Sequence, residues 1–544
     1  MNRRKQFGTG VRSVPLCVAA FLVIASVTEA PAAVLLFYGG ASSHMVLQRD
    51  APLPMAGRAQ PGEEVTVEFA GQKKSAVADA KGDWRVVLDP LPASKEPRTL
   101  TAATSTGPAQ VLEDVLVGDV WFGSGQSNMA FNTDLQWGDK SSPKDEVLAA
   151  LVAAQHPLVR LAGHKGWVAA TDPDRNRGFS ALMLSFGVAL QREIDVPVGL
   201  VVNAASATPS AAFLSEEQFL ADPACRKAAE RAAASADVPQ VKAERERLLA
   251  AWEEARRQAR AEKRPEPPRP KVPWVPGDPQ GRLGRSFVGV LAGMPVRGIL
   301  WDQGESGSGI EWVDQYTMMG ALIRGWRREL GQPDVPFLYV QKPNGGGCAW
   351  DPADPVTSYA SGFAPLPKTV PDNAIGPFGI DRGEYIRLRE HDRTFMVPST
   401  DLGGGTHPGC KSGYGARAAR VTLGAVYGRK IAFSGPTYAG HAIEGDKVRV
   451  RFTHVGQGLA FRHAEKLHGF AVAGEDGHFH WADAVIDGDT VVVSSPAVPN
   501  PAAVRYAWSA DMTWANLFNK DGLPGVSFRT DDPAAGGGPP PRGR

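Results

Sequence analysis

Short runs of alternating apolar and polar residues mark both ends of the chain. Residues 64–69 (Glu-Val-Thr-Val-Glu-Phe) alternate strictly, and so do residues 447–452 (Lys-Val-Arg-Val-Arg-Phe). Turn signals such as Pro61-Gly62 separate the N-terminal runs. A period of two is typical of strands that bury one face. We therefore predict a small β-sandwich over residues 34–115 and a second β region over residues 431–530.

Between these ends, apolar residues recur at helical spacing in stretches that alternate with short apolar runs. One such stretch covers residues 179–194 and is followed by the strand-like run 198–202. Another covers residues 316–330, ahead of the run 337–340. Alternating helices and strands predict an α/β domain over residues 116–430, with a parallel sheet covered on both faces.

Residues 215–280 interrupt this alternation. The stretch from residue 216 to 264 is rich in Ala, Glu and Arg, which favours helices, and residues 265–270 (Pro-Glu-Pro-Pro-Arg-Pro) stiffen the return. We predict a helical insertion within the α/β domain. The composition fits a solvated helical arm, and it also fits a lid over a binding site.

One strand-like run ends in the most informative turn of the chain. The apolar residues of the stretch 117–122 lead into Gly123-Ser124-Gly125-Gln126-Ser127-Asn128. Glycines directly before a serine allow a sharp turn that holds the hydroxyl at the carboxyl edge of a sheet, where open α/β folds place their ligands. Taken alone, this is an ordinary Gly/Ser turn. Its interpretation depends on the segments that accompany it.

The first residues have the layout of a targeting segment. Arg3, Arg4 and Lys5 precede an apolar run over residues 14–27 and a stretch of small residues that ends near Ala32. This layout predicts a cleavable secretory signal peptide over residues 1–32, and hence a secreted or periplasmic protein with no membrane span after cleavage. At the other end, the Gly/Pro-rich residues 531–544 predict a disordered tail.

Charge and cysteine content exclude several classes of function. The formal net charge of +1 gives no reason to expect a nucleic-acid partner. Cys17 lies in the signal segment, which leaves Cys225, Cys348 and Cys410, too few for a disulfide scaffold. Cys348 and Cys410 fall in loops predicted at one face, and their pairing stays open. No C-x-x-C or H-E-x-x-H spacing occurs, so we predict no metal and no cofactor.

Three further segments accompany the Gly-Gln-Ser-Asn turn. Residues 203–209 (Asn-Ala-Ala-Ser-Ala-Thr-Pro) and 301–306 (Trp-Asp-Gln-Gly-Glu-Ser) each follow a strand-like run, and residues 401–408 (Asp-Leu-Gly-Gly-Gly-Thr-His-Pro) precede a helix-like stretch. In this order the four segments resemble the sequence blocks of the sialate O-acetylesterase family, a carbohydrate-esterase branch of the SGNH (GDSL-like) hydrolases. Residues 44–50 resemble the opening signature of that family, and residues 505–508 and 516–519, followed by 521–524, resemble its closing signature. The resemblance therefore covers nearly all of the mature chain.

The resemblance implies an SGNH-like three-layer catalytic domain, a jelly-roll-like N-terminal domain and a set of site residues. A serine hydroxyl needs a base to take its proton, and the matched positions are Ser127 as nucleophile and His407 as base. Ester hydrolysis also needs donors for the oxyanion. The implied donors include the backbone N–H of Ser127. The further candidates for the oxyanion hole and for substrate binding come from the same blocks: Gln126, Ala207, Gln303 and Glu305.

Two departures from the family pattern bear on activity. The second block usually carries glycines, whereas this chain has Ser206-Ala207-Thr208-Pro209 and is one residue shorter. Many SGNH enzymes place an aspartate three residues before the histidine, where this chain has Gly404. The nearest replacement for that aspartate is Asp401, with Glu305 as the other candidate. A serine–histidine dyad without a third member is a further alternative.

These observations predict a secreted serine esterase that removes O-acetyl groups from a sugar through an acetyl-enzyme intermediate. The substrate is sialic acid or an acetylated polysaccharide. The alternative is a catalytically weakened or inactive carbohydrate-binding protein that keeps the fold. A lipase of the α/β-hydrolase type is excluded because no Gly-x-Ser-x-Gly elbow surrounds Ser127. The sequence leaves the oligomeric state open.

Overall fold

The computed structural model describes residues 35–36, 40–133, 145–163, 166–234, 238–262, 264, 267, 270, 283–291, 293–310, 312–342, 363–376, 380–403 and 405–531. The predicted signal peptide, nearly all of the predicted tail and Cys348 lie outside these residues. The predictions made for them are therefore not addressed by the structure.

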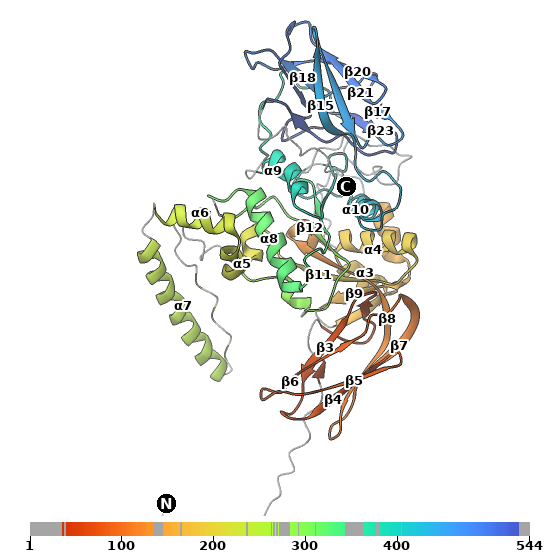
Figure 1. Ribbon diagram of the computed structural model, residues 1–544, viewed down its shortest axis with the longest axis vertical. Helices are drawn as coiled ribbons and strands as arrows, with labels where there is room; N and C mark the ends of the chain where they lie inside the picture. The colour runs from red at the N-terminus through yellow and green to blue at the C-terminus, as the bar shows by residue number, and fades with distance from the viewer. Residues whose placement is uncertain are drawn as a thin grey trace, which may run out of the picture.

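The described residues up to Gly125 form β-strands and turns, drawn from red to orange in Figure 1. The strand β4 (Glu64–Phe69) buries Val65, Val67 and Phe69, as its alternating pattern predicts. It pairs with β5 (Gln72–Val77) and with β7 (Ser94–Thr104). A separate sheet joins the remaining antiparallel strands, β1 (Leu35–Leu36), β3 (Leu53–Arg58) and β6 (Asp83–Leu88).

One long strand connects this region to the rest of the molecule. β8 (Gln110–Gly125) pairs with β7 and β2 (Val46–Gln48) in its first part, then enters the central sheet between β11 (Val198–Ala204) and β12 (Gly298–Asp302). The boundary predicted at residues 115 and 116 therefore falls inside a single strand. Because β8 pairs with strands of both regions, β2, β4, β5 and β7 belong to the same continuous sheet as the central strands.

The central sheet has the strand order β10-β9-β11-β8-β12-β13-β14. Its strands are parallel except for the antiparallel pair β9 (His156–Gly163) and β10 (Gly166–Ala170). The strands β13 (Phe337–Val340) and β14 (Thr394–Val397) complete one edge. The predicted α/β class is confirmed, with a mixed sheet and additional β-sheets at both ends.

Helices cover both faces of this sheet. Trp121 points into a core with α4 (Ala181–Ile194) and α10 (Lys411–Ala425), while the next residue, Phe122, points into a core with α8 (Gln315–Leu330). Shorter helices surround these three: α1 (Ser127–Ala130), α2 (Glu146–Ala153), α3 (Pro173–Gly178) and α9 (Arg382–Arg387).

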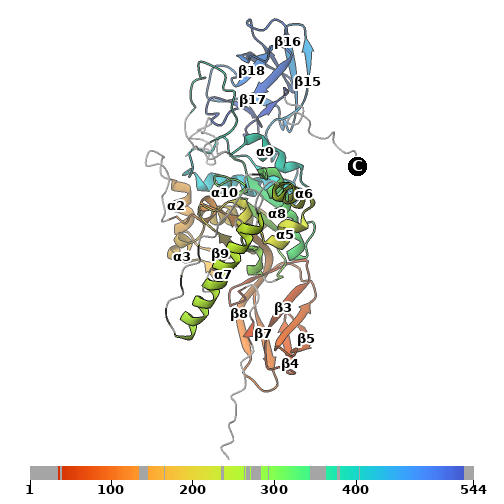
Figure 2. The same cartoon turned by 90° about the vertical axis from the view of Figure 1, so that its left-hand side faces the viewer.

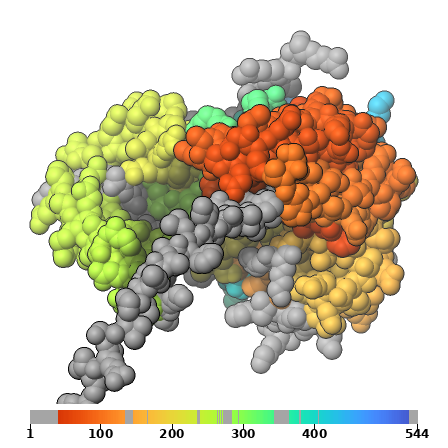
Figure 3. Space-filling model, turned by 90° about the horizontal axis from the view of Figure 1, so that it is seen from below, coloured from red at the N-terminus to blue at the C-terminus, as the bar shows by residue number. Residues whose placement is uncertain are grey.

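The predicted insertion contains three helices, α5 (Glu216–Ala221), α6 (Pro223–Ala233) and α7 (Val238–Ala261). In Figure 1, α7 stands apart on the left of the molecule, and in Figure 2 it lies in front of the central domain. In Figure 3 the insertion lies to the left of the N-terminal strands. Ion pairs such as Arg247–Glu244 form on the surface of α7. Both the arm and the lid interpretations of this insertion stay predictions.

The C-terminal residues form the β-sheets drawn in blue in Figure 1. One has the order β15 (Thr437–Glu444), β16 (Lys447–Thr453), β21 (Thr490–Ser494), β20 (Asp483–Asp487). A second has the order β19 (His480–Trp481), β18 (Phe470–Ala473), β22 (Ala503–Tyr506), β24 (Phe528–Arg529), and β17 (Leu459–Phe461) pairs with β23 (Leu517–Asn519). Arg382 of α9 attaches this region to the α/β domain, since its guanidinium donates to the carbonyl oxygens of Ser509 and Ala510 at 2.8 and 3.1 Å. Within the described part of the chain, no helix combines the length and apolar character needed to cross a bilayer.

Candidate active site

Three neighbouring strands end together at the carboxyl edge of the central sheet. Gly125, the last residue of β8, is paired in register with Ala204 of β11 and Asp302 of β12. Gly125 has a φ of 132°, and a Cβ at this position would lie 2.2 Å from the carbonyl oxygen of Asp302. Only glycine fits there, so the chain turns sharply and begins α1 at Ser127.

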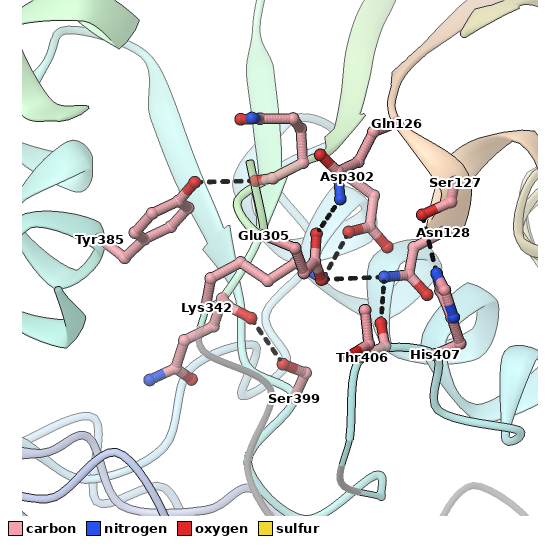
Figure 4. A network of polar contacts seen from close by, with 12 residues as sticks. Gln126, Ser127, Asn128, Asp302, Glu305, Lys342, Tyr385, Ser399, Thr406 and His407 are labelled. Carbon is pink, nitrogen blue, oxygen red and sulfur yellow. Dashed lines mark hydrogen bonds and ion pairs between the residues drawn. The ribbon is translucent and has the colours of Figure 1, made fainter. Parts of the chain in front are cut away.

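The turn brings Ser127 against a histidine that lies far away in the sequence. Ser127 Oγ is 2.9 Å from His407 Nε2, and Figure 4 shows the two side chains facing each other. His407 lies in the loop before α10, and its ring packs against Phe131 with 4.6 Å between ring centroids. The predicted nucleophile and the predicted base are thus within hydrogen-bonding distance.

The surroundings of His407 favour its neutral form. Burial of the imidazole lowers its pKa below the ordinary value of 6.5, and the nearby Lys411 ammonium lowers it further. A neutral imidazole has one ring nitrogen free to accept a proton. At neutral pH, His407 Nε2 is therefore able to accept the hydroxyl proton of Ser127.

The prediction for the Gln303 side chain is corrected by its hydrogen bonds. Gln303 is completely buried, and its Oε1 accepts from Ser210 Oγ at 2.7 Å. Its Nε2 donates to the carbonyl oxygens of Gly307 and Thr208 at 3.1 and 3.4 Å. In this arrangement the carboxamide donates to the protein backbone and not to an oxyanion site. It ties the loop after β11 to the loop after β12.

The prediction for Asp401 is also corrected. Both of its carboxylate oxygens accept from the guanidinium of Arg417, at 3.0 and 2.8 Å, and both side chains are buried. This bidentate pair ties the loop before His407 to α10. Among the described residues, no carboxylate is hydrogen-bonded to His407. A third member of a Ser-His-Asp arrangement is therefore not found at Asp401.

Glu305 and Gln126 lie beside Ser127 but bind each other. Gln126 Nε2 donates to Glu305 Oε2 at 2.6 Å, and the ammonium of Lys342 is 2.7 Å from Glu305 Oε1. Burial would raise the pKa of Glu305, but the Lys342 ammonium outweighs it and keeps that pKa below its ordinary value. Glu305 is thus an ionised, buried group underneath the site and, like Asp401, it makes no hydrogen bond to His407.

Four residues of this polar cluster were not identified from the sequence. They are Asn128, Asp302, Lys342 and Lys411. Lys342 Nζ lies 2.8 Å from Asp302 Oδ1, and Lys411 Nζ donates to Asn128 Oδ1 at 2.6 Å. Asn128 and Asp302 lie inside predicted blocks, and Lys411 begins α10 shortly after the fourth block. Lys342 comes two residues after the end of β13, and no predicted block lies beside it.

The second block has an unusual backbone. Ala207 has a φ of 54°, in the left-handed region that favours glycine. The loop lies beside the serine turn because the N–H of Ala205 donates to the carbonyl oxygen of Gly125 at 2.9 Å. The chain thus keeps at Ala207 a backbone conformation suited to the glycine that the family usually carries in this block.

Comparisons with known proteins add to this geometry. The chain matches no protein-family model. It is 27% identical to the sialate O-acetylesterase of Rattus norvegicus over 60% of this chain and 64% of that protein, and 27% identical to that of Mus musculus over 60% and 63%. This chain therefore matches slightly less than two thirds of these relatives' length.

Among solved structures, the chain is similar to a carbohydrate acetylesterase from Xanthomonas citri. The TM-score is 0.69 with 26% sequence identity, and the match covers 92% of this chain and 99% of the other. The predicted resemblance is confirmed: this chain is similar in sequence to sialate O-acetylesterases and in structure to a carbohydrate acetylesterase.

Proposed function

We propose that this protein is an exported serine esterase of SGNH type that hydrolyses O-acetyl esters on carbohydrates. The observation that carries the proposal is the 2.9 Å distance between Ser127 Oγ and His407 Nε2 at the carboxyl edge of a parallel sheet. The relatives named above support the ester and carbohydrate parts of the proposal. The signal-peptide pattern of residues 1–32 supports export.

In the proposed acylation step, Ser127 Oγ attacks the acetyl carbonyl carbon while His407 Nε2 takes its proton. The carbonyl oxygen becomes an oxyanion, which needs hydrogen-bond donors. The backbone N–H groups of Ser127 and Ala207 are suited to this, because neither donates to an acceptor among the described residues. Collapse of the intermediate expels the sugar oxygen, which takes the proton from His407.

In the proposed deacylation step, His407 removes a proton from water, which attacks the acetyl-serine carbonyl. Acetate leaves, and the proton returns to Ser127 Oγ. Since no described carboxylate contacts His407, we propose that the pair acts as a dyad. The loss of an orienting carboxylate slows catalysis of this kind without abolishing it.

The direct test is acetate release from an aryl acetate, followed by a panel of O-acetylated sialic acid and O-acetylated polysaccharides. Labelling of Ser127 by an organophosphonate tests the nucleophile independently of the sugar. If the protein binds acetylated glycans but neither releases acetate nor reacts with the phosphonate, the carbohydrate-binding alternative replaces this proposal.

The pH dependence of the reaction follows from the state of His407. We expect kcat/KM for an aryl acetate to fall as the pH decreases through the pKa of His407, because the protonated imidazole cannot accept the serine proton. Burial and Lys411 lower that pKa, so the midpoint of the acidic limb is expected below pH 6.5. A pH–rate profile at constant ionic strength measures it. A midpoint well above 6.5 would contradict the described surroundings of His407.

The backbone at Ala207 gives a prediction about stability. Ala207→Gly is expected to raise the free energy of unfolding by up to about 1 kcal/mol, because a left-handed φ costs about 1–2 kcal/mol for a residue with a Cβ. Ala205→Gly in the same loop is the control. Ala205 has no left-handed φ, so this variant is expected to lose stability. Urea denaturation compares them, and equal losses would show that Ala207 is unstrained.

A further inference from the structure

A second contact joins the two halves of the site. Asn128 follows Ser127 and is completely buried, and its Nδ2 donates to the carbonyl oxygen of Thr406 at 2.9 Å. Thr406 directly precedes His407. The segments 127–128 and 406–407 are therefore linked twice, once through the serine–imidazole contact and once through the side chain of Asn128, as Figure 4 shows.

The partners of Asn128 allow only one orientation of its amide. Lys411 Nζ donates to Oδ1 at 2.6 Å, and Nδ2 also donates to Glu305 Oε1 at 2.9 Å. An ammonium can only donate, and carboxylate and carbonyl oxygens can only accept. Rotating the amide by 180° would place its N–H groups against the ammonium. The side chain of Asn128 is thus fixed, and it fixes the backbone next to His407.

Burying the charged side chain of Lys411 at this position costs free energy. It is the first residue of α10 and is buried, and its ammonium lies over the rings of Tyr414 and Phe131, at 5.1 and 5.8 Å from their centroids. No carboxylate of the described residues is within ion-pair distance of it. Burial without a direct counter-ion lowers its pKa to about 8, although Asp302 and Glu305 oppose this at longer range. A stability role does not account for such a group.

We propose that Asn128, held by Lys411 and Glu305, is the positioning residue for His407, and that this trio replaces the orienting carboxylate. Asn128 makes no hydrogen bond to the imidazole of His407, and it acts through the backbone at Thr406. Lys411 has two effects: it locks the amide of Asn128, and its charge disfavours the imidazolium. The inference rests on the proposed esterase function of Ser127 and His407.

The first test is the variant Asn128→Ala. We expect kcat for an aryl acetate to fall about 10- to 100-fold with KM within about twofold, because a misplaced base weakens the transition state and leaves ground-state binding unchanged. Thr422→Val is the control, since it removes from α10 a buried hydroxyl that has no hydrogen-bond partner among the described residues. We expect this control to keep the kcat of the wild type.

The second test measures the pKa of the His407 imidazole. The pKa of His407 is measured in the resting enzyme by NMR of ¹⁵N-labelled histidine, with His407→Gln used for assignment. The charged groups that act on His407 are Lys411, Glu305, Lys342 and Asp302. We expect Lys411→Met to raise the pKa of His407 and to move the acidic limb of the rate profile upward, and Lys411→Arg to restore both toward wild type.

The outcomes separate this inference from the proposed function. If Asn128→Ala does not fold, the variants Lys411→Met and Lys411→Arg test the inference in its place. Unchanged kcat and unchanged pKa of His407 in the folded Asn128 and Lys411 variants overturn the inference, and so does an equal loss of kcat in Thr422→Val. If the wild type releases no acetate, the proposed function fails, while the shift in the pKa of His407 still tests the positioning trio.

Discussion

Ser127→Ala is expected to lower kcat for an aryl acetate by about 10³-fold or more, because it removes the atom that forms the acetyl-enzyme. His407→Ala is expected to have an effect of similar size, since the serine hydroxyl is a weak nucleophile without a base. The double variant is expected to lose little beyond either single variant, because residues that act as a unit are strongly non-additive.

Ser124→Ala is the control for this experiment. Ser124 lies three residues earlier on β8, and its buried hydroxyl donates to the carbonyl oxygen of Asn203 at 2.6 Å. It belongs to the same strand but not to the proposed chemistry, so we expect its kcat to stay within a few-fold of wild type. Acetate release by Ser127→Ala at the wild-type rate would rule out this serine as the nucleophile.

The second large effect concerns stability. Arg417→Met is expected to lower the free energy of unfolding by about 3–5 kcal/mol, because it leaves the buried carboxylate of Asp401 without its partner. The double variant Asp401→Asn with Arg417→Met is expected to recover much of that loss, since no buried charge then remains. Urea denaturation of the wild type, of Arg417→Met, of Asp401→Asn and of the double variant measures the coupling free energy between the two side chains.

Activity separates this structural role of Asp401 from a role in the triad. The kcat of Asp401→Asn is measured under conditions where the variant is folded, and we expect it to stay within a few-fold of the wild-type kcat. Replacing a triad aspartate by asparagine instead lowers kcat by about 10⁴-fold. The exposed ion pair Arg58–Asp83 is the control for stability. We expect Arg58→Met to change the free energy of unfolding by no more than about 1 kcal/mol. A 10⁴-fold loss in a folded Asp401→Asn variant would restore Asp401 to the triad.

The sequence predicted most of what depends on local pattern. The alternation in residues 64–69 predicted which side chains of β4 face inward, and helical spacing predicted the buried stripe of α4. The glycines before Ser127 predicted a turn at the end of a strand, and Gly125 occupies a position where a Cβ has no room. These predictions succeeded because periodicity and backbone sterics act over a few residues.

The sequence could not decide which polar groups pair. Asp401 is the carboxylate nearest to His407 along the chain, but Arg417 of the following helix, α10, donates hydrogen bonds to both of its oxygens. Gln303 lies in a block of its own, but Ser210, 93 residues away, occupies its Oε1. A hydrogen bond depends on positions within a few tenths of an ångström, and the packing of distant elements sets those positions.

The sequence by itself determined the α/β class, the strand-end positions of Ser127 and the second and third blocks, and the residue types available for ester chemistry. Only the tertiary structure decided that Ser127 contacts His407, 280 residues later in the chain. It also decided that Asp401 and Gln303 form hydrogen bonds with other partners, and that Lys411 binds Asn128 beside the loop that carries His407. The physical reason is that the periodicity of apolar residues over a few positions determines which face of an element is buried. The partner of each buried polar group depends instead on how distant elements pack in the folded chain.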